Sequence, residues 1–356
     1  MNTTILARIN ARFAGGNWLT SPPPKPEPSR TKLLGAALAA IILALVVLLV
    51  SGMAQAAGEG CNGVQVSPGD NLTQVAAARA PGTTYCIQDG DYPVTSNIVV
   101  EDGDTFSGVY SDSTRPTIST TTAEHIFHTS GADGVTIRGL DISGAVHNNI
   151  CEPNCGRAIG GGGNNLLVED VRAHHNENQG IGGTGNGLRV IGSELDHNGS
   201  HDAAADSSTR SAAGIKSINS MYVYNSYIHD NYWAGVWCDL ECGTFEVHDS
   251  TITANGKVGI HDEISSGPAL FEGNRIQGNG YSESYDGKLQ GGIMITSSRH
   301  VRTHHNAFRN NSGPGVLVRQ SPRPPQVQDV RIHDNVTYRD GIRGCDISGV
   351  TCTRND

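Results

Sequence analysis

The sequence predicts an all-β, single-domain right-handed parallel β-helix (a solenoid) of roughly ten coils with an N-terminal capping helix. Two residue ladders that run in step indicate this fold, and so does the composition. Glycine accounts for 45 of the 356 residues, and aromatic residues for only 5%. No long helical period of apolar residues follows residue 80, so strands and turns are expected to build the core.

The first ladder is a glycine followed by an aliphatic residue, and its intervals are 34, 21, 24, 33 and 23 residues by subtraction. Its members are Gly180-Ile181, Gly214-Ile215, Gly235-Val236, Gly259-Ile260, Gly292-Ile293 and Gly315-Val316. The second ladder consists of asparagines, namely Asn198, Asn231, Asn255, Asn279 and Asn311. Repeats of this length with short strand segments are typical of parallel solenoids. We interpret the asparagines as turn residues whose amides bond to the coils above and below.

Loops and an end cap complete the expected β-helix, which we place at residues 64–338. The two long intervals predict loops at residues 199–210 and 280–290, and a third is expected at residues 146–156. Gly69-Asp70-Asn71 precedes a short amphipathic segment in which Asp70 or Asn71 is the expected N-cap. This helix would cover the N-terminal end of the core, where an open strand edge invites aggregation.

The N-terminal region predicts export. Residues 33–50 are an unbroken apolar or small run, preceded by a positively charged flank and followed by Ala54-Gln55-Ala56, a cleavage-like pattern. We therefore expect residues 1–32 to be cytoplasmic or an n-region, and residues 33–56 to be a signal peptide or a membrane anchor. Residues 58–356 form the β-helix domain. This domain is secreted or lies on the extracellular face of the membrane, which it contacts only through the N-terminal segment if that segment is uncleaved.

All eight cysteines follow the hydrophobic run and fall into local pairs. An even number of cysteines in an exported chain indicates disulfides. The expected pairs are Cys61–Cys86, Cys151–Cys155, Cys238–Cys242 and Cys345–Cys352. The net charge of −10 and the lack of a basic tract in the mature part argue against nucleic acid as a partner.

Side chains alternate between the inside and the outside of a solenoid wall, which predicts two outward rows. One row holds Lys216, Trp237, His261 and Met294, and the other holds Ile218, Asp239, Glu263, Thr296 and Arg319. Because paired strands lie about 4.8 Å apart, Asp239 and Glu263 become neighbours. A retaining glycosidase needs two carboxyl groups about 5 to 5.5 Å apart, which this spacing nearly supplies. Trp237 would offer a face for sugar rings, and His261, Lys216 and Arg319 would bond hydroxyls or a carboxylate.

The same stretch carries a resemblance. Gly235-Val236-Trp237-Cys238-Asp239, and then His261-Asp262-Glu263-Ile264 with Gly267-Pro268, resemble the catalytic stretch of the β-helix β-xylosidase family of glycoside hydrolases. The repeats as a whole resemble pectate-lyase-like β-helix proteins. The resemblance implies that Asp239 is the nucleophile and Glu263 the acid/base. Leu240 stands where that family commonly has a tryptophan.

Three functions remain open, all with a polysaccharide or oligosaccharide as partner. The first is glycoside hydrolysis without a cofactor. The second is a polysaccharide lyase in which Lys216 or Arg319 removes a proton from a uronate and a calcium ion assists. That ion would be held by clustered carboxylates, namely Asp239, Glu241, Asp262 and Glu263. The third is a non-enzymatic surface or adhesion protein. The histidines at 174–175, 229 and 304–305 are interpreted as turn or surface residues.

Overall fold

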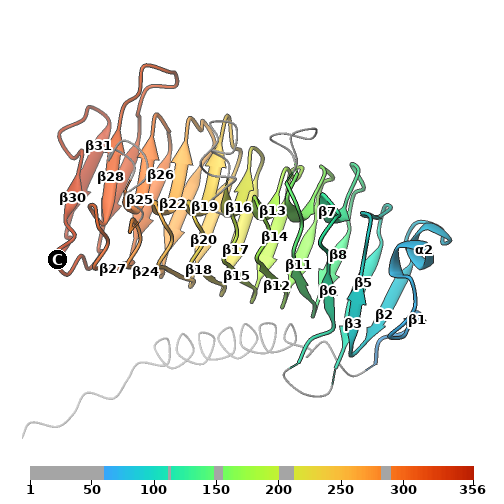
Figure 1. The fold of residues 1–356 in the computed structure, drawn as a ribbon. Coiled ribbons are helices and arrows are strands. Elements are labelled where there is room, and N and C mark those ends of the chain that lie inside the picture. The colour runs from blue at the N-terminus through green and yellow to red at the C-terminus, as the bar shows by residue number, and fades with distance from the viewer. Residues whose placement is uncertain (1–59, 111–113, 148–154, 200–211, 282–289) are drawn as a thin grey trace, which may run out of the picture. The chain divides into compact units, whose positions relative to one another are not determined.

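The computed structural model describes residues 60–110, 114–147, 155–199, 212–281 and 290–356 (Figure 1). Residues 56–356 form a compact unit of their own. The predictions for the hydrophobic run and the cleavage pattern lie outside the described residues, as do the central parts of the three predicted loops. Among the residues that are described, no helix is long and apolar enough to cross a membrane.

The described strands form three parallel sheets of twelve, ten and nine strands. The twelve-stranded sheet contains β1 Val64–Val66, β2 Thr84–Gln88, β5 Thr105–Val109, β8 Thr136–Arg138, β11 Leu167–Glu169, β14 Leu188–Ile191, β17 Met221–Tyr224, β20 Phe245–His248, β23 Ala269–Glu272, β26 Val301–His304, β29 Val330–His333 and β31 Val350–Thr353. The ten-stranded sheet contains β4 Ile98–Val99, β7 His125–His128, β10 Arg157–Gly160, β13 Gln179–Gly182, β16 Ala213–Ser217, β19 Ala234–Asp239, β22 Val258–Glu263, β25 Gly291–Thr296, β28 Val316–Arg319 and β30 Ile342–Arg343. The nine-stranded sheet contains β3 Asp91–Pro93, β6 Thr117–Ser119, β9 Asp141–Ser143, β12 Arg172–His174, β15 Glu194–Asp196, β18 Tyr227–His229, β21 Thr251–Thr253, β24 Arg275–Gln277 and β27 Ala307–Arg309.

Successive strands visit the three sheets in turn, so that each strand pairs with the strand one coil before it and one coil after it. For example, β19 lies in the ten-stranded sheet, β20 in the twelve-stranded sheet and β21 in the nine-stranded sheet, and β22 returns beside β19 (Figure 1). The predicted parallel β-helix is therefore confirmed. It begins at the expected Val64 but continues beyond residue 338, because β30 and β31 add to its C-terminal end.

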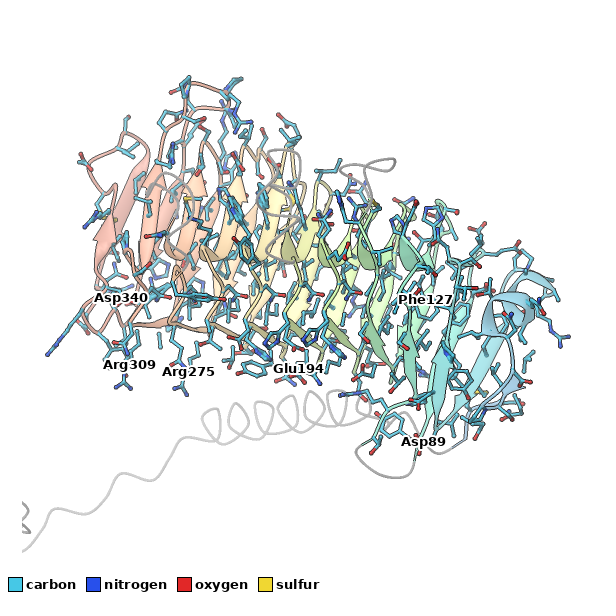
Figure 2. The ribbon with its side chains drawn as sticks, in the orientation of Figure 1. Asp89, Phe127, Glu194, Arg275, Arg309 and Asp340 are labelled. Atoms are coloured by element: carbon cyan, nitrogen blue, oxygen red, sulfur yellow. A yellow bond between two sulfur atoms is a disulfide. The ribbon has the colours of Figure 1, made fainter. Side chains whose placement is uncertain are left out.

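The core is a stack of aliphatic side chains inside the solenoid, and the aliphatic residues of the first ladder form one of its columns. Ile215, Val236, Ile260 and Ile293 are aligned in register and fully buried. Side chains alternate as expected from a pleated strand. In Figure 2, Arg275 and Arg309 point away from the nine-stranded sheet, and their neighbours Ile276 and Phe308 are buried.

The asparagine ladder is also confirmed. Each Nδ2 donates to the Oδ1 of the asparagine one coil further on, at 3.0 Å from Asn198 to Asn231 and 2.9 Å from Asn231 to Asn255. The ladder starts at Asn176 and ends on the carboxylate of Asp340, which accepts from Asn311 at 2.7 Å. A second ladder, which the sequence analysis missed, links Asn274, Asn306, Asn335 and Asn355 by the same bond.

The two predicted ladders run in step because the glycine leaves room for the asparagine. A Cβ on Gly214 would lie 2.9 Å from Nδ2 of Asn231, and a Cβ on Gly235 would lie 2.9 Å from Nδ2 of Asn255. Contacts that short exclude a side chain. The aliphatic column and the amide ladder therefore occur together in each coil.

The cap and most of the cysteine pairs agree with prediction. Helix α2 spans Leu72–Ala77, and Oδ1 of its N-cap Asn71 accepts a hydrogen bond from the Gln74 amide at 3.1 Å. The structure contains the disulfides Cys61–Cys86, Cys238–Cys242 and Cys345–Cys352. The predicted Cys151–Cys155 pair involves Cys151, which lies outside the described residues.

Candidate active site on the ten-stranded sheet

The ten-stranded sheet aligns the predicted site residues on its outer face. Lys216, Trp237, His261 and Met294 are in register across β16, β19, β22 and β25. Asp239 and Glu263 are direct partners two positions further along, and this row continues with Thr296 and Arg319. Adjacent positions on paired strands place Asp239 and Glu263 one strand spacing apart, about 4.8 Å. The register predicted for these residues is therefore observed, apart from that of Ile218, which follows the end of β16.

Asp239 is paired with a lysine. Its Oδ2 lies 3.2 Å from Nζ of Lys216, and the two side chains are only 12% and 16% exposed. The same ammonium group lies 3.3 Å from the ring centroid of Trp237, a cation–π contact. Burial lowers the pKa of Lys216, and the carboxylate of Asp239 opposes that shift. The other carboxylate oxygen of Asp239, Oδ1, has no hydrogen-bond partner within the part of the chain that the structure describes.

Glu263 has a different environment. Its Oε1 lies 2.6 Å from a guanidinium nitrogen of Arg323, and its side chain is 15% exposed. Burial and the neighbouring charge of Asp239 raise the pKa of Glu263, against the opposing effect of Arg323. Asp239 thus faces a lysine, whereas burial and a neighbouring carboxylate favour the protonated form of Glu263. A carboxyl group with a raised pKa is typical of a general acid.

Trp237 and His261 are buried, whereas we expected them to border an open groove. Trp237 is 5% exposed, and His261 is 1% exposed. The ring of Trp237 stacks on Trp233 at 4.8 Å and on His261 at 5.5 Å. Burial, reinforced by the charges of Lys216 and Arg319, holds the pKa of His261 well below its usual range. The Trp237 ring therefore packs against Lys216 on one side and near His261, and neither buried ring presents a free face to a sugar.

The four carboxylates considered for calcium do not converge. Asp262 directly precedes Glu263 in β22, so its side chain points to the opposite, inner face of the sheet, where it is buried. Neither of its carboxylate oxygens has a hydrogen-bond partner among the described residues. Burial raises the pKa of Asp262 to about 7. Glu241 lies in the exposed turn after β19, outside the sheet.

A groove extends along the same sheet toward the N-terminus. It has a volume of about 610 Å³ and reaches from β7 to Ile218 and Asn219, which directly follow β16. Its polar lining includes Glu124, His125, His128 and Arg157. Burial lowers the pKa of Arg157 to about 10, so this guanidinium remains charged at neutral pH. The groove thus offers cationic and imidazole groups on the strands of this sheet that precede β19 and β22.

The sequence analysis missed both the groove and Arg323. Four consecutive glycines, Gly160 to Gly163, were the available signal for the groove, because a Cβ at Gly161 would lie 2.6 Å from the ring of His128. These glycines leave space for the side chains that line the wall. Arg323 lies in the segment after β28, 60 residues from Glu263, and no spacing rule connects the two.

Comparison with known proteins agrees with the fold. Residues 107–276 match the family model described as right handed beta helix region. No curated protein sequence matches the chain. The structure is similar to PfbA, a surface adhesin of Streptococcus pneumoniae, with a TM-score of 0.57 and 14% identity over 81% of this chain and 82% of that chain. It is also similar to the A-module of the mannuronan C-5 epimerase AlgE6 of Azotobacter vinelandii, with a TM-score of 0.46 and 13% identity over 80% and 93% of the two chains. A third similar structure is the pectate lyase Pel9A, with a TM-score of 0.43 and 14% identity over 82% and 79%.

Proposed function

We propose that this protein is an exported carbohydrate-active enzyme, a retaining glycoside hydrolase in which Asp239 is the nucleophile and Glu263 is the acid/base. The observation that carries the proposal is the register pair Asp239–Glu263 on the outer face of the ten-stranded sheet. The spacing of paired strands is close to the carboxyl separation of about 5 to 5.5 Å that retaining enzymes use. The disulfides support export, because they persist in oxidising compartments.

The contacts support one assignment of roles over the reverse. Nζ of Lys216 lies 3.2 Å from Oδ2 of Asp239 and fixes the position of this carboxylate, as a nucleophile requires. The raised pKa of Glu263 favours the protonated form that a general acid requires. In the first step, Asp239 attacks the anomeric carbon while Glu263 protonates the leaving oxygen. In the second step, Glu263 removes a proton from the water that releases the sugar.

Arg323 controls access to Glu263. Its side chain is 57% exposed, so a substrate can displace it from the carboxyl group without disturbing the core. The groove that begins at Ile218 would hold the sugars next to the cleaved bond, and Arg319 flanks the pair on the other side. A substrate chain would therefore lie along the solenoid axis, across several coils.

Substitution of the two carboxyl groups tests the mechanism in the full-length chain. Asp239→Asn and Glu263→Gln are each expected to abolish turnover while the circular dichroism spectrum stays unchanged. Glu263→Ala should regain activity with azide or with an activated leaving group, because the nucleophile remains, whereas Asp239→Asn should not regain activity at any pH. Full activity of either carboxyl variant would refute the assignment.

A polysaccharide lyase is the second candidate, and the buried Lys216 favours it. Burial lowers the pKa of this amine, which makes it a better base near neutral pH. The products separate the candidates in a screen of plant and bacterial polysaccharides. Reducing sugar without ultraviolet absorbance identifies hydrolysis, and unsaturated absorbing products identify a lyase. Binding without either product would indicate a surface protein, in line with the adhesin whose fold is similar.

A further inference from the structure

The twelve-stranded sheet carries a second cluster of ionisable side chains, at the ends of consecutive strands. This sheet is not the one that carries the proposed active site. The last residues of consecutive strands there are in register, namely Tyr224, His248, Glu272, His304 and His333. Tyr224 stacks on His248 at 5.0 Å, and His304 stacks on His333 at 4.9 Å. Glu272 thus lies in a row of aromatic and imidazole rings.

The side chain of His305 also lies next to this row because of its backbone conformation. Consecutive residues in a strand point to opposite faces, so His304 and His305 would normally diverge. His305 follows the end of β26 and has a φ of 55°, in the left-handed region. Both rings therefore lie on the outer side, with Nδ1 of His304 only 2.8 Å from Nδ1 of His305.

Glu272 provides a third donor atom from the preceding coil. Its Oε1 lies 3.5 Å from Nδ1 of His304 and 3.8 Å from Nδ1 of His305. Its Oε2 lies 3.8 Å from Nδ1 of His248. In the described part of the chain, the ionic partners of Glu272 are all histidines, with no arginine or lysine among them. Its charge is therefore available to a cation.

We propose that Glu272, His304 and His305 form a binding site for a divalent transition-metal ion such as Zn²⁺. The three donor atoms lie within 4.8 Å of one another. Zinc–ligand bonds of about 2.0 to 2.2 Å in a tetrahedron place neighbouring donors about 3.3 Å apart. The observed donor separations of 2.8, 3.5 and 3.8 Å therefore each need to change by about 0.5 Å or less. Two imidazoles and one carboxylate suit zinc or copper and are a poor set for calcium. The fourth position faces solvent, because the His305 side chain is 62% exposed.

Two other clusters in the described residues lack one of these features. His174 and His175 place their Nδ1 atoms 2.7 Å apart, but Asp141 bonds to the opposite nitrogen of His174, Nε2, at 2.7 Å. That pair therefore has the same geometry without a third donor between the rings.

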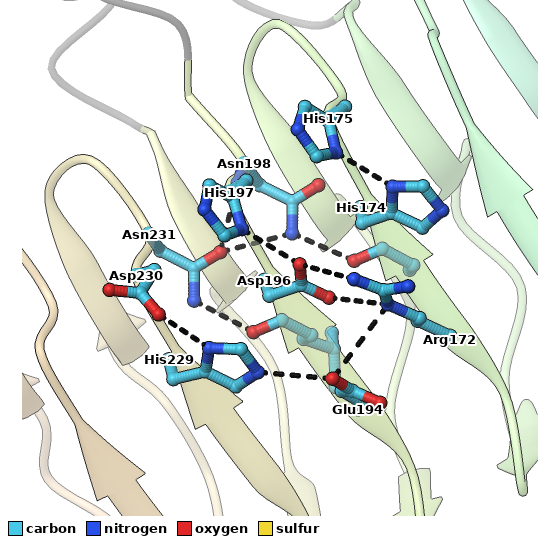
Figure 3. A network of polar contacts seen from close by, with 12 residues as sticks. Arg172, His174, His175, Glu194, Asp196, His197, Asn198, His229, Asp230 and Asn231 are labelled. Atoms are coloured by element: carbon cyan, nitrogen blue, oxygen red, sulfur yellow. Dashed lines mark hydrogen bonds and ion pairs between the residues drawn. The ribbon is translucent and has the colours of Figure 1, made fainter.

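In the other cluster, an arginine already pairs with the carboxylates. Glu194, Asp196 and His229 are close together, as Figure 3 shows. The guanidinium of Arg172 binds both oxygens of Asp196 at 2.9 Å and lies 3.7 Å from Glu194 (Figure 3). A cation already neutralises these carboxylates, so a metal ion would have to displace it.

The test is a titration of the untagged full-length chain with ZnCl₂, measured by isothermal titration calorimetry. We expect one saturable site that excess CaCl₂ does not compete for. His305→Ala and Glu272→Gln should each weaken zinc affinity by at least about tenfold, since each removes one of three ligands. His175→Ala is the matched control, and it should leave the affinity unchanged. With CuCl₂ in place of ZnCl₂, electron paramagnetic resonance should show two coordinated nitrogens in the wild type and one in His305→Ala.

Three results would overturn the proposal. One is the lack of saturable zinc binding, and another is unchanged affinity in both His305→Ala and Glu272→Gln. The third is an equal loss in His175→Ala, which would mean that zinc binds histidine pairs without selecting this one. None of these results bears on Asp239 and Glu263, because those residues lie on another sheet.

Discussion

Replacement of Asn255 by alanine tests how much the amide ladder contributes to stability. The Asn255 side chain is fully buried and makes four hydrogen bonds. It donates to the Ile228 carbonyl at 3.1 Å and to Oδ1 of Asn279 at 3.0 Å. Its Oδ1 accepts from the backbone amide of Asn231 at 3.2 Å and from Nδ2 of Asn231 at 2.9 Å. Alanine removes all four bonds.

The expected loss is about 4 kcal/mol, from four bonds at a net value of about 1 kcal/mol each. Two of the groups that lose a hydrogen bond to the Asn255 side chain keep another partner. Nδ2 of Asn231 still donates to the Leu195 carbonyl, and Oδ1 of Asn279 still accepts from the backbone amide of residue 255. The backbone amide of Asn231 loses its acceptor in a position without solvent access, and this prevents water from reducing the cost.

Urea unfolding followed by circular dichroism measures the change, with the free energy of unfolding taken from the midpoint at a common slope. Asn164→Ala is the matched control, because this asparagine is exposed and its side chain makes two exposed hydrogen bonds, donated to Asp133 and accepted from the Asn186 amide. The control should lose less than about 1 kcal/mol. If Asn255→Ala loses no more than Asn164→Ala, the ladder does not stabilise the solenoid, and our account of the repeat is wrong.

Four further predictions concern the sheet that carries the proposed active site. Gly235→Ala should destabilise the protein by about 2 kcal/mol in thermal denaturation, because the new Cβ would lie 2.6 Å from the Gly259 carbonyl oxygen; an unchanged melting temperature would contradict this. Lys216→Met should lower kcat/KM by at least about tenfold on an activated aryl glycoside, because Asp239 loses the ammonium group that positions its carboxylate; an unchanged kcat/KM would contradict this. Arg323 lowers the pKa of Glu263, so Arg323→Met should raise that pKa and move the alkaline limb of the kcat/KM profile to higher pH; a shift to lower pH would oppose the acid/base role. Burial raises the folded-state pKa of Asp262 from 3.8 to about 7, so the stability of the wild type should fall as pH rises from about 4 to about 7 and level off above that, whereas Asp262→Asn should lack this fall in urea unfolding at about pH 5 and pH 8.

The repeat architecture was readable from the sequence because one coil constrains the next. A glycine must lie where the ladder amide packs, so Gly235 and Asn255 carry the same period. Once the period is known, the alternation of the strands gives the two outward rows, and Asp239 and Glu263 follow as neighbours. These inferences need only local rules. The end of the solenoid was placed too early because Gly341-Ile342, whose isoleucine in β30 pairs with Val316, was left out of the glycine–aliphatic ladder.

The surroundings of the candidate site were not readable in this way. Outward direction does not determine exposure, and Trp237 and His261 point outward yet are buried by packing with Trp233 and other side chains. Arg323 reaches Glu263 from a segment outside the repeat, where no periodicity applies. The second asparagine ladder was missed because its members Asn274 and Asn306 lack the glycine–aliphatic pair that follows four residues after Asn231 and Asn255 in the first.

The positions of two disulfides determine where the solenoid begins to unfold. An end coil has one neighbour instead of two, so fraying is expected to start at the ends. Cys61–Cys86 ties the chain before β1 to β2, and Cys345–Cys352 ties the chain before β31 to that last strand. The first of these closes 25 residues, which is worth about 3.5 kcal/mol on the loop-closure estimate. Reducing conditions should therefore shorten the folded rod from both ends while its central coils persist.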